Sequence, residues 1–320
     1  MVKMKAKAKL QYKVAKAFAP ASVGNVGVGF DTLGHVMQGV GDTVTAVVTG
    51  NSLVMGKVSG CVTSLPEDPA KNTAGKAVIA MLKALEIEQG IELQLDKGIP
   101  LGSGMGGSAA SAVAAVKAVN ALLAVPLTDD ELYQYALVGE AVASGAEHGD
   151  NIAPSLYGGL ILLAGEKQKP VSVNVPSTLY YVCVHSNVKI ETKIARKVLP
   201  TSLELQEAVT FGRNLAGLLV GCEQSNFELI QASLKDDIIE PTRKAMIPGF
   251  DEIKQTALNE GALGCSISGS GPNIFAWVEG KTRAEKVCEA MHSTALKHHK
   301  IVNKYIGQVA SGGAKILEQK

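Results

Sequence analysis

The sequence predicts an α/β protein with two domains. Its 320 residues, 46% of them hydrophobic, can bury a large core and exceed the usual size of one domain. Residues 91–96 alternate between apolar and polar side chains, which predicts a half-buried strand. Residues 109–124 are mostly Ala, Val and Leu, which predicts a buried helix. Glycines at positions 102, 104, 106 and 107 lie between the two and predict a loop whose backbone N–H groups turn inward.

This glycine loop, residues 100–111, has the features of a phosphate-binding site. The helix after it directs free N–H groups and the positive end of its dipole into the loop. The loop also fits the dinucleotide pattern G-x-G-x-x-G, but the acidic residues roughly 20 positions later, Asp129 and Asp130, open a helix instead of ending a strand. Ser108 and Ala109 stand where a Walker A loop carries Lys and Ser or Thr. A glycine-rich turn that serves only close packing is the alternative.

The first informative segment is a glycine-punctuated loop over residues 19–34, after an extended run over 14–18. It contains two polar residues, Asn25 and Asp31, between Val and Phe neighbours. Buried polar groups need partners. A bound ligand would supply them, and so would Asx turns within the loop.

The helix that opens at Asp129 predicts a metal ligand. Thr128 and Glu131 form a capping box at its start. Glu140 lies four positions after Ala136 on the apolar face of this helix. An ionised carboxylate there costs several kcal/mol unless a cation or metal pairs with it. The alternative is a Glu at the edge of the face that reaches water.

A polar loop follows this helix. The loop over residues 145–159 contains His148 and Asn151. Arginine is scarce: the chain has only Arg196, Arg213, Arg243 and Arg283. Arginine offers a rigid bidentate fork for a carboxylate, although exposed surface arginines are the alternative. The remaining predicted elements are strands over 44–48, 180–185 and 274–278 and helices over 73–85, 190–198 and 250–260.

Composition and charge exclude several classes of protein. The chain has 31 Lys and Arg against 30 Asp and Glu, so no charge excess favours nucleic acid. It contains neither an apolar run long enough to span a membrane nor a signal-peptide pattern. The five scattered cysteines form no Cys-x-x-Cys pair and predict free thiols. We therefore expect a cytoplasmic protein that binds neither nucleic acid nor membrane.

Three motifs, in their order along the chain, resemble those of the GHMP kinases, a family that phosphorylates small alcohols. They lie at residues 19–34, 100–111 and 261–272. Residues 100–111 read P-x-G-S-G-x-G-x-S-A-x-S, and the third motif is the Gly/Ser-rich segment 261–272. Residues 19–34, A-P-A-S-x-x-N-x-G-x-G-F-D-x-L-G, and residues 148–159, H-x-D-N-x-x-P-x-x-x-G-G, resemble the members that act on L-homoserine. The resemblance implies an S5-like N-terminal ATP-binding domain over residues 1–168 and a ferredoxin-like C-terminal domain over 169–320.

The resemblance also implies a role for individual residues. Asn151 stands where sister kinases carry a catalytic Asp, and because Asn is no useful base we expect it to orient the substrate. Glu140 and Ser108 are expected to hold Mg²⁺ and to act in catalysis. The expected substrate contacts are Asn25, Asp31, His148, Thr192, Arg196 and Arg243. Asn72 and Lys97 are weaker candidates for ATP contacts, and the alternative is that both are ordinary polar residues on the surface. The expected ATP contacts are Pro100, Leu101, Gly102, Ser103, Gly104, Met105, Gly106, Gly107, Ser108, Ala109 and Ala110.

The implied reaction is ATP-dependent phosphorylation of the L-homoserine side-chain hydroxyl, a step of threonine biosynthesis. A homodimer is the expected assembly, although no feature of the sequence specifies the oligomeric state. Two alternatives remain open. A mevalonate-type sister kinase would carry Asp at position 151. A non-catalytic metabolite-binding regulator on the same fold would be expected to lose Glu140 or Ser108, and the chain has both. Met105 and Gly107 replace residues that are frequent in the family, which affects the expected nucleotide affinity more than the function.

Overall fold

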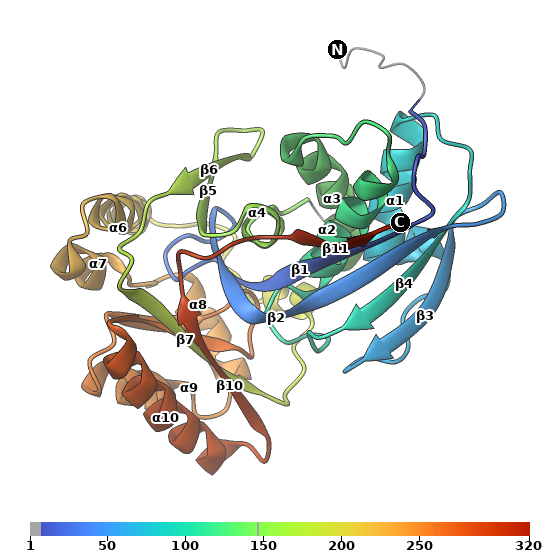
Figure 1. The fold of residues 1–320 in the computed structure, drawn as a ribbon. Helices are drawn as coiled ribbons and strands as arrows, with labels where there is room; N and C mark the ends of the chain where they lie inside the picture. Colours follow the sequence, from blue (N-terminus) through green and yellow to red (C-terminus); the bar gives the residue numbers. More distant parts are fainter. Residues whose placement is uncertain (1–7, 146) are drawn as a thin grey trace.

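The computed structural model of the chain describes residues 8–145 and 147–320, and within them the strands form a larger and a smaller sheet (Figure 1). The larger sheet has seven strands, all paired antiparallel except β3 with β4. Its main path is β11 (Lys315–Gln319), β1 (Val14–Gly24), β2 (Leu33–Val48), β4 (Ile91–Lys97) and β3 (Val54–Gly60). A hairpin of β5 (Leu160–Ala164) and β6 (Lys169–Val173) joins it through β2.

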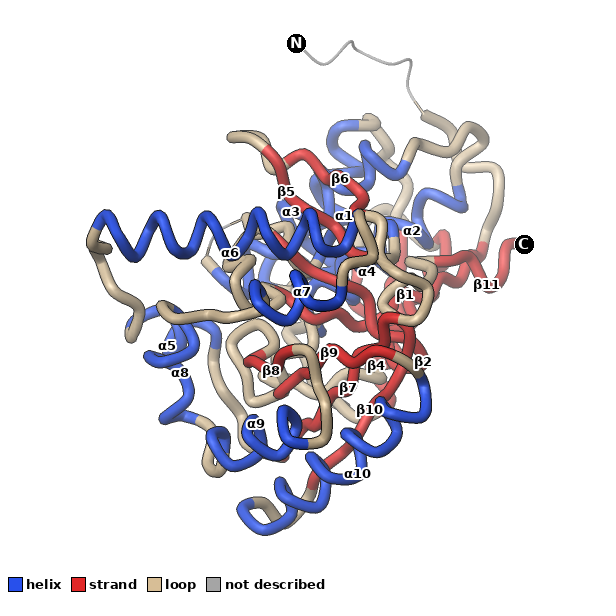
Figure 2. The backbone as a smooth tube through the Cα atoms, turned by 90° about the vertical axis from the view of Figure 1, so that its left-hand side faces the viewer, coloured by secondary structure: helices blue, strands red, loops and turns tan. Residues whose placement is uncertain are grey.

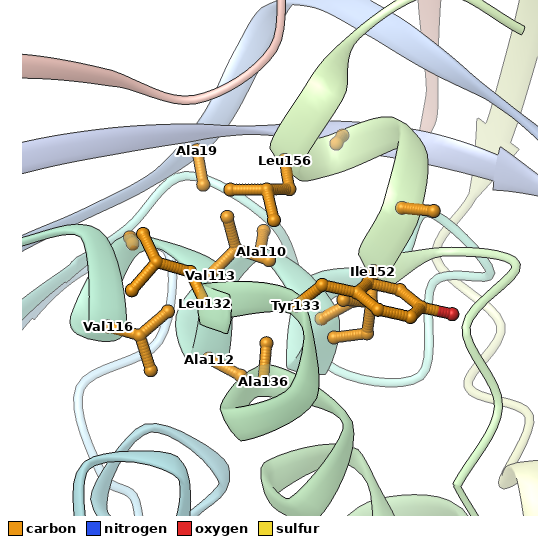
Figure 3. Packing of buried hydrophobic residues seen from close by; sticks show 14 of the residues in the cluster. Ala19, Ala110, Ala112, Val113, Val116, Leu132, Tyr133, Ala136, Ile152 and Leu156 are labelled. Carbon is orange, nitrogen blue, oxygen red and sulfur yellow. The ribbon is translucent and has the colours of Figure 1, made fainter. Parts of the chain in front are cut away.

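Four helices cover one face of the larger sheet, and α2 contacts each of the other three. They are α1 (Thr73–Ala84), α2 (Gly107–Leu122), α3 (Asp129–Ser144) and α4 (Ile152–Tyr157). Helix α2 packs against β1 and β2 on one side and against the other three helices elsewhere. Its alanines let these neighbours approach closely, and Figure 3 shows Ala110, Ala112 and Val113 among side chains of α3 and α4. The rigid N-terminal end of α2 carries the glycine loop.

The smaller sheet and two helices form a ferredoxin-like unit. In chain order the elements are β7 (Leu179–Ser186), α9 (Phe250–Asn259), β8 (Gly264–Ile267), β9 (Ile274–Glu279), α10 (Lys281–His298) and β10 (Val302–Gln308). The strand order is β10-β7-β9-β8, which is the βαββαβ arrangement. Helices α9 and α10 cover its outer face (Figure 2). The two-domain fold expected from the sequence is therefore confirmed.

The two units share a core because β7 and β9 are buried on both faces. Val182 and Val184 pack with the side chains of α9 and α10, whereas Tyr181 belongs to the core of the larger unit. The buried His35 ring of β2 lies 5.2 Å from the Tyr181 ring and 5.8 Å from the Trp277 ring, measured between ring centroids. The relative position of the two units therefore depends on close packing.

The remaining helices follow β7 or flank α1 and α9. They are α5 (Thr192–Lys197), α6 (Leu205–Glu223), α7 (Phe227–Ser233), α8 (Ile239–Arg243) and the 3₁₀ helices η1 (Pro69–Lys71) and η2 (Lys244–Met246). None of the described helices combines the length and apolar composition that a membrane span needs. All five cysteines lie within the described residues and are free thiols, as predicted.

Most predicted elements are present with boundaries within two residues, but two strands are longer than predicted. Strand β1 continues to Gly24 and β2 begins at Leu33, so the loop expected over 19–34 is confined to residues 25–32. Pairing with neighbouring strands holds these glycine-containing segments extended. The expected domain boundary at 168/169 falls inside the β5–β6 hairpin, and β11 returns to the larger sheet, so the two units are not consecutive halves of the chain.

Candidate active site

A cavity of about 480 Å³ lies where the glycine loop faces the smaller unit. The larger unit contributes its loop from 100 to 108 and the side chains of Asn25, Asp31, Glu140 and Asn151. The segment between β7 and β9 contributes Thr192, Arg196, Arg243, Gly269 and Ser270. Residues from all the motifs singled out in the sequence therefore meet in one cavity.

The glycine loop has the geometry of an anion-binding cradle. Gly102, Gly104 and Gly106 have φ values of 63°, 72° and 66°. A Cβ atom at Gly106 would lie 2.2 Å from the Ser22 hydroxyl oxygen, so the position requires glycine. Helix α2 begins at Gly107, and no side chain caps its first turn. Its N–H groups are therefore available to a ligand in the cavity.

The Gly/Ser-rich segment over residues 261–272 packs beside this loop. The Ser268 hydroxyl donates to the Gly104 carbonyl oxygen at 2.6 Å. A Cβ atom at Gly104 would lie 2.7 Å from the Gly271 carbonyl oxygen, so the two backbones approach too closely for any other residue. The smaller unit thus fixes the loop from outside.

Not all the predicted ATP contacts have side chains in the cavity. Met105, Ala109 and Ala110 are fully buried in the core and do not line the cavity. Ala109 and Ala110 lie in the first turn of α2 on its core-facing side, and Met105 precedes the helix. For these three residues, any contact with a nucleotide must therefore come from the backbone.

Asn72 and Lys97 are not surface residues, so the alternative considered for them is wrong. The Asn72 side chain accepts hydrogen bonds from the N–H groups of Ala74 and Gly75 at the start of α1. Lys97 is 2% exposed and pairs with the buried Asp42 carboxylate. Its Nζ also donates to the Gly107 carbonyl oxygen at 3.0 Å, so Lys97 anchors the first turn of α2. A contact of either side chain with nucleotide remains a prediction.

Glu140 and Ser108 lie together beside the cradle. A hydrogen bond joins the Ser108 hydroxyl to the Glu140 carboxyl group. The Oε2 atom of Glu140 is buried, and the partly exposed side chain lines the cavity. Burial raises the pKa of Glu140 to about 8, although the bond from Ser108 opposes the shift. An ionised Glu140 would therefore be stabilised by a bound cation.

Asn25 and Asp31 shape the opposite end of the cavity. Both have left-handed backbone conformations, with φ of 70° and 55°, which Asn and Asp tolerate better than most residues. The Asn25 amide donates to the Gly269 carbonyl oxygen at 2.9 Å and accepts from the Asp31 N–H at 3.1 Å. An Asx turn would join the Asn25 side chain to the backbone two residues on, so these bonds to residues 31 and 269 do not form one. They hold Asn25 in place and leave the Asp31 carboxylate directed toward other partners.

The Asp31 carboxylate pairs with a guanidinium group from the other unit. Arg196 Nη1 lies 3.0 Å from Asp31 Oδ2, and Nη2 lies 2.8 Å from Oδ1, which is a bidentate ion pair. His148 Nδ1 lies 3.6 Å from Oδ2. Burial lowers the pKa of His148 against the opposing charge of Asp31, so this imidazole is neutral near pH 7.

Arg243 is the second arginine at this end, and it is 2% exposed. Its Nη1 donates to the Gly269 carbonyl oxygen at 2.9 Å, and its Nε donates to the Ala195 carbonyl oxygen at 3.2 Å. The guanidinium groups of Arg196 and Arg243 lie 5.6 and 5.3 Å from the centroid of the same Phe30 ring. Neither is a free surface arginine, so that alternative is wrong for both.

Asn151 is held from two sides at the start of α4. Its Oδ1 accepts a hydrogen bond of 2.9 Å from the Ser22 hydroxyl, and its Nδ2 donates to Asp150 Oδ2 at 3.2 Å. An amide has two donor hydrogens and two acceptor lone pairs. One of each therefore remains for a ligand in the cavity.

Sequence reasoning missed Asp150, which lines the cavity and is 5% exposed. Burial raises the pKa of Asp150 to about 7, and the nearby Asp31 charge adds to the shift. Its position in H-x-D-N, directly before Asn151, could have identified it. Among the residues that the structure describes, no three His, Cys, Asp or Glu side chains cluster as a metal site.

The chain is similar to known proteins over nearly its whole length. Residues 72–159 match the model of the GHMP kinases N terminal domain, and residues 218–298 match that of the GHMP kinases C terminal domain. It is 46% identical over 304 residues to a homoserine kinase of Xylella fastidiosa (strain M12), covering 95% of this chain and 94% of that protein. It is 47% identical over 280 residues to a homoserine kinase of Xanthomonas campestris pv. campestris (strain B100), covering 87% and 86% of the two chains.

Among solved structures, the homoserine kinase from Cytophaga hutchinsonii ATCC 33406 superposes with a TM-score of 0.92. The two sequences are 40% identical, and the match covers 97% of this chain and 99% of the other.

Proposed function

The chain belongs to the GHMP kinase family, among its homoserine kinases, and on that premise we propose that it transfers the γ-phosphoryl group of ATP to the side-chain hydroxyl of L-homoserine. The product is O-phospho-L-homoserine, an intermediate of threonine biosynthesis. The enzyme is a phosphotransferase with an alcohol as acceptor.

One observation carries the assignment of substrate. A single cavity contains a phosphate cradle at one end and, at the other, a carboxylate with two arginines. The turn from His148 to Asn151 connects the two ends, since His148 lies beside Asp31 and the Asn151 amide lies beside Gly106. A small alcohol that carries both an ammonium and a carboxylate group matches this arrangement.

The residues at the cradle suit Mg²⁺. This ion prefers oxygen ligands and usually keeps one or two protein ligands in addition to nucleotide phosphates and water. The Ser108 hydroxyl and the Glu140 carboxylate supply such oxygens, and burial of Glu140 favours a cation beside it. When bound there, Mg²⁺ would neutralise charge on the transferring phosphoryl group.

Residues of the chain bind the phosphates, hold the charged groups of the substrate and orient its hydroxyl. The N–H groups of the glycine loop hold the phosphates, and Asp31, Arg196 and Arg243 hold the charged groups of the amino acid. The Asn151 amide orients the hydroxyl for in-line attack, and Ser22 and Asp150 keep the amide itself in place. The bond between the γ-phosphorus and the bridging oxygen of ATP breaks as the bond to the homoserine oxygen forms. In a loose transition state the hydroxyl proton leaves late, so no strong base at Asn151 is required.

An ADP-release assay tests this function. Purified protein with ATP and Mg²⁺ is offered L-homoserine, mevalonate, galactose and shikimate in parallel. We expect turnover with L-homoserine and little with the other three, since none of them has an ammonium group to pair with Asp31. Preferred turnover of mevalonate would support the sister-kinase alternative, and binding without turnover of any alcohol would support a regulator.

A further inference from the structure

We infer that Gln168, in the turn of the β5–β6 hairpin, is a positioning residue that holds the loop before α4 in the conformation that binds the substrate. This loop carries His148, Asp150 and Asn151, which line the cavity. Gln168 is not among the described residues that line the cavity, so it acts through the loop and not on the substrate. The inference rests on the proposed function and adds a residue to it.

The side chain of Gln168 is bonded to the loop backbone on both sides of His148. Its Oε1 accepts from the Gly149 N–H at 3.2 Å, and its Nε2 donates to the Glu147 carbonyl oxygen at 2.9 Å. A peptide group of a parallel strand pairs with its neighbour through the same two bonds. Residues 147–149 have no regular secondary structure, so the Gln168 amide takes the place of a strand partner for them.

The turn that carries Gln168 is itself fixed to a buried helix. The Tyr133 hydroxyl of α3 donates to the Gln168 carbonyl oxygen at 3.1 Å, and the Tyr133 side chain is 1% exposed. A Cβ atom at Gly149 would lie 2.0 Å from the same hydroxyl oxygen, so the loop lies against Tyr133. Glu140 lies about two turns further along α3. These contacts therefore connect the loop to the helix that carries the proposed metal ligand.

The backbone conformation of Gln168 supports a role for its side chain. Its φ is 48°, in the left-handed region, which Gly, Asn and Asp adopt more readily than Gln. The turn by itself would therefore favour one of these residues. Glycine has no side chain, and asparagine is one methylene shorter, so neither could replace both bonds to the loop. Unfavourable backbone conformations of this kind cluster at functional sites.

Loss of the two bonds should lower the fraction of molecules in which the loop is positioned. A ligand that binds one conformation has an apparent affinity reduced in proportion to the population of that conformation. Saturating L-homoserine selects the positioned loop, so the loss should affect KM more than kcat. ATP is held by the glycine loop over residues 100–111, so KM for ATP should not change.

Gln168→Gly and Gln168→Asn test the inference in the full-length protein. Both remove the pair of bonds to the loop, and both suit a positive φ. We expect KM for L-homoserine to rise roughly 5- to 30-fold, the range for one or two lost neutral hydrogen bonds. The midpoint of urea unfolding should change little, because relief of the backbone offsets part of the loss. Without substrate, deuterium exchange measured by mass spectrometry should be faster in the peptide that contains the Gly149 amide.

Lys167→Gln changes an exposed residue of the same turn and serves as the matched control, with no change expected in any of these quantities. A purely structural role of Gln168 would leave KM for L-homoserine at the wild-type value in a variant of unchanged unfolding midpoint. That result, an equal rise in both KM values, or unchanged exchange at Gly149 overturns the inference. Failure of wild type to phosphorylate L-homoserine overturns the proposed function instead, and the exchange measurement still tests the contact between Gln168 and the loop.

Discussion

The proposed role of Glu140 as a ligand of Mg²⁺ predicts that the Mg²⁺ dependence of the reaction varies with pH. Burial raises the pKa of this group to about 8. A metal ligand must be ionised, so Mg²⁺ binding becomes stronger as pH rises toward that pKa and levels off above it. With a pKa of about 8, the ionised fraction is about 1% at pH 6, about 9% at pH 7 and about 50% at pH 8. The apparent Mg²⁺ affinity should thus rise roughly 50-fold from pH 6 to pH 8.

The assay is a Mg²⁺ titration of the ADP-release rate at saturating ATP and L-homoserine, repeated at pH 6, 7, 8 and 9. ATP has its own titration in this range, so the readout is the difference between wild type and Glu140→Gln. The isostere keeps the volume of the side chain and loses the ionisable group, and loss of one electrostatic contact of this kind lowers turnover by about 10²–10³. Asp150→Asn removes a neighbouring charge that contributes to the raised pKa of Glu140, so it should keep a pH dependence but move it to lower pH. An equal pH dependence in wild type and Glu140→Gln would refute the assignment of Glu140 as the metal ligand.

Three further predictions concern the substrate, the acceptor hydroxyl and the support of the cradle. Arg196→Lys should raise KM for L-homoserine roughly tenfold or more and leave KM for ATP nearly unchanged, because it loses the bidentate fork. The measurement is steady-state kinetics with both substrates varied, and an equal rise in both KM values would contradict the prediction. Asn151→Asp should not accelerate turnover and Asn151→Ala should slow it, since the amide orients without removing a proton; a faster Asp variant with a new pKa in its pH–rate profile would speak for a missing base. Lys97→Met should lower the free energy of unfolding in urea by about 3–5 kcal/mol by leaving Asp42 unpaired, and the double variant Lys97→Met/Asp42→Asn should recover part of that loss.

The sequence by itself determined the secondary structure and the position of the cradle. Side-chain periodicity and helix capping act between residues close in the chain, so they can be read locally. The alternation predicted for β4 and the capping box at Thr128 and Glu131 are both present. The glycines at 102, 104 and 106 likewise adopt the positive φ values that only glycine takes at low cost.

Only the tertiary structure decided which polar residues are buried and with what partner. Lys97 reads as a surface residue in the sequence, yet it is buried because Asp42, 55 positions earlier, lies opposite it in β2. The Asp31–Arg196 pair depends in the same way on a contact between the two units. The burial of Asp150 depends on its packing beside Gly24 and Gly34, which are more than 100 positions earlier in the chain. Side-chain burial and ion pairing are set by which distant segments pack together, and no local pattern specifies that. The types of functional residue could therefore be identified from the sequence, whereas their burial and charge pairing could be known only from the tertiary structure.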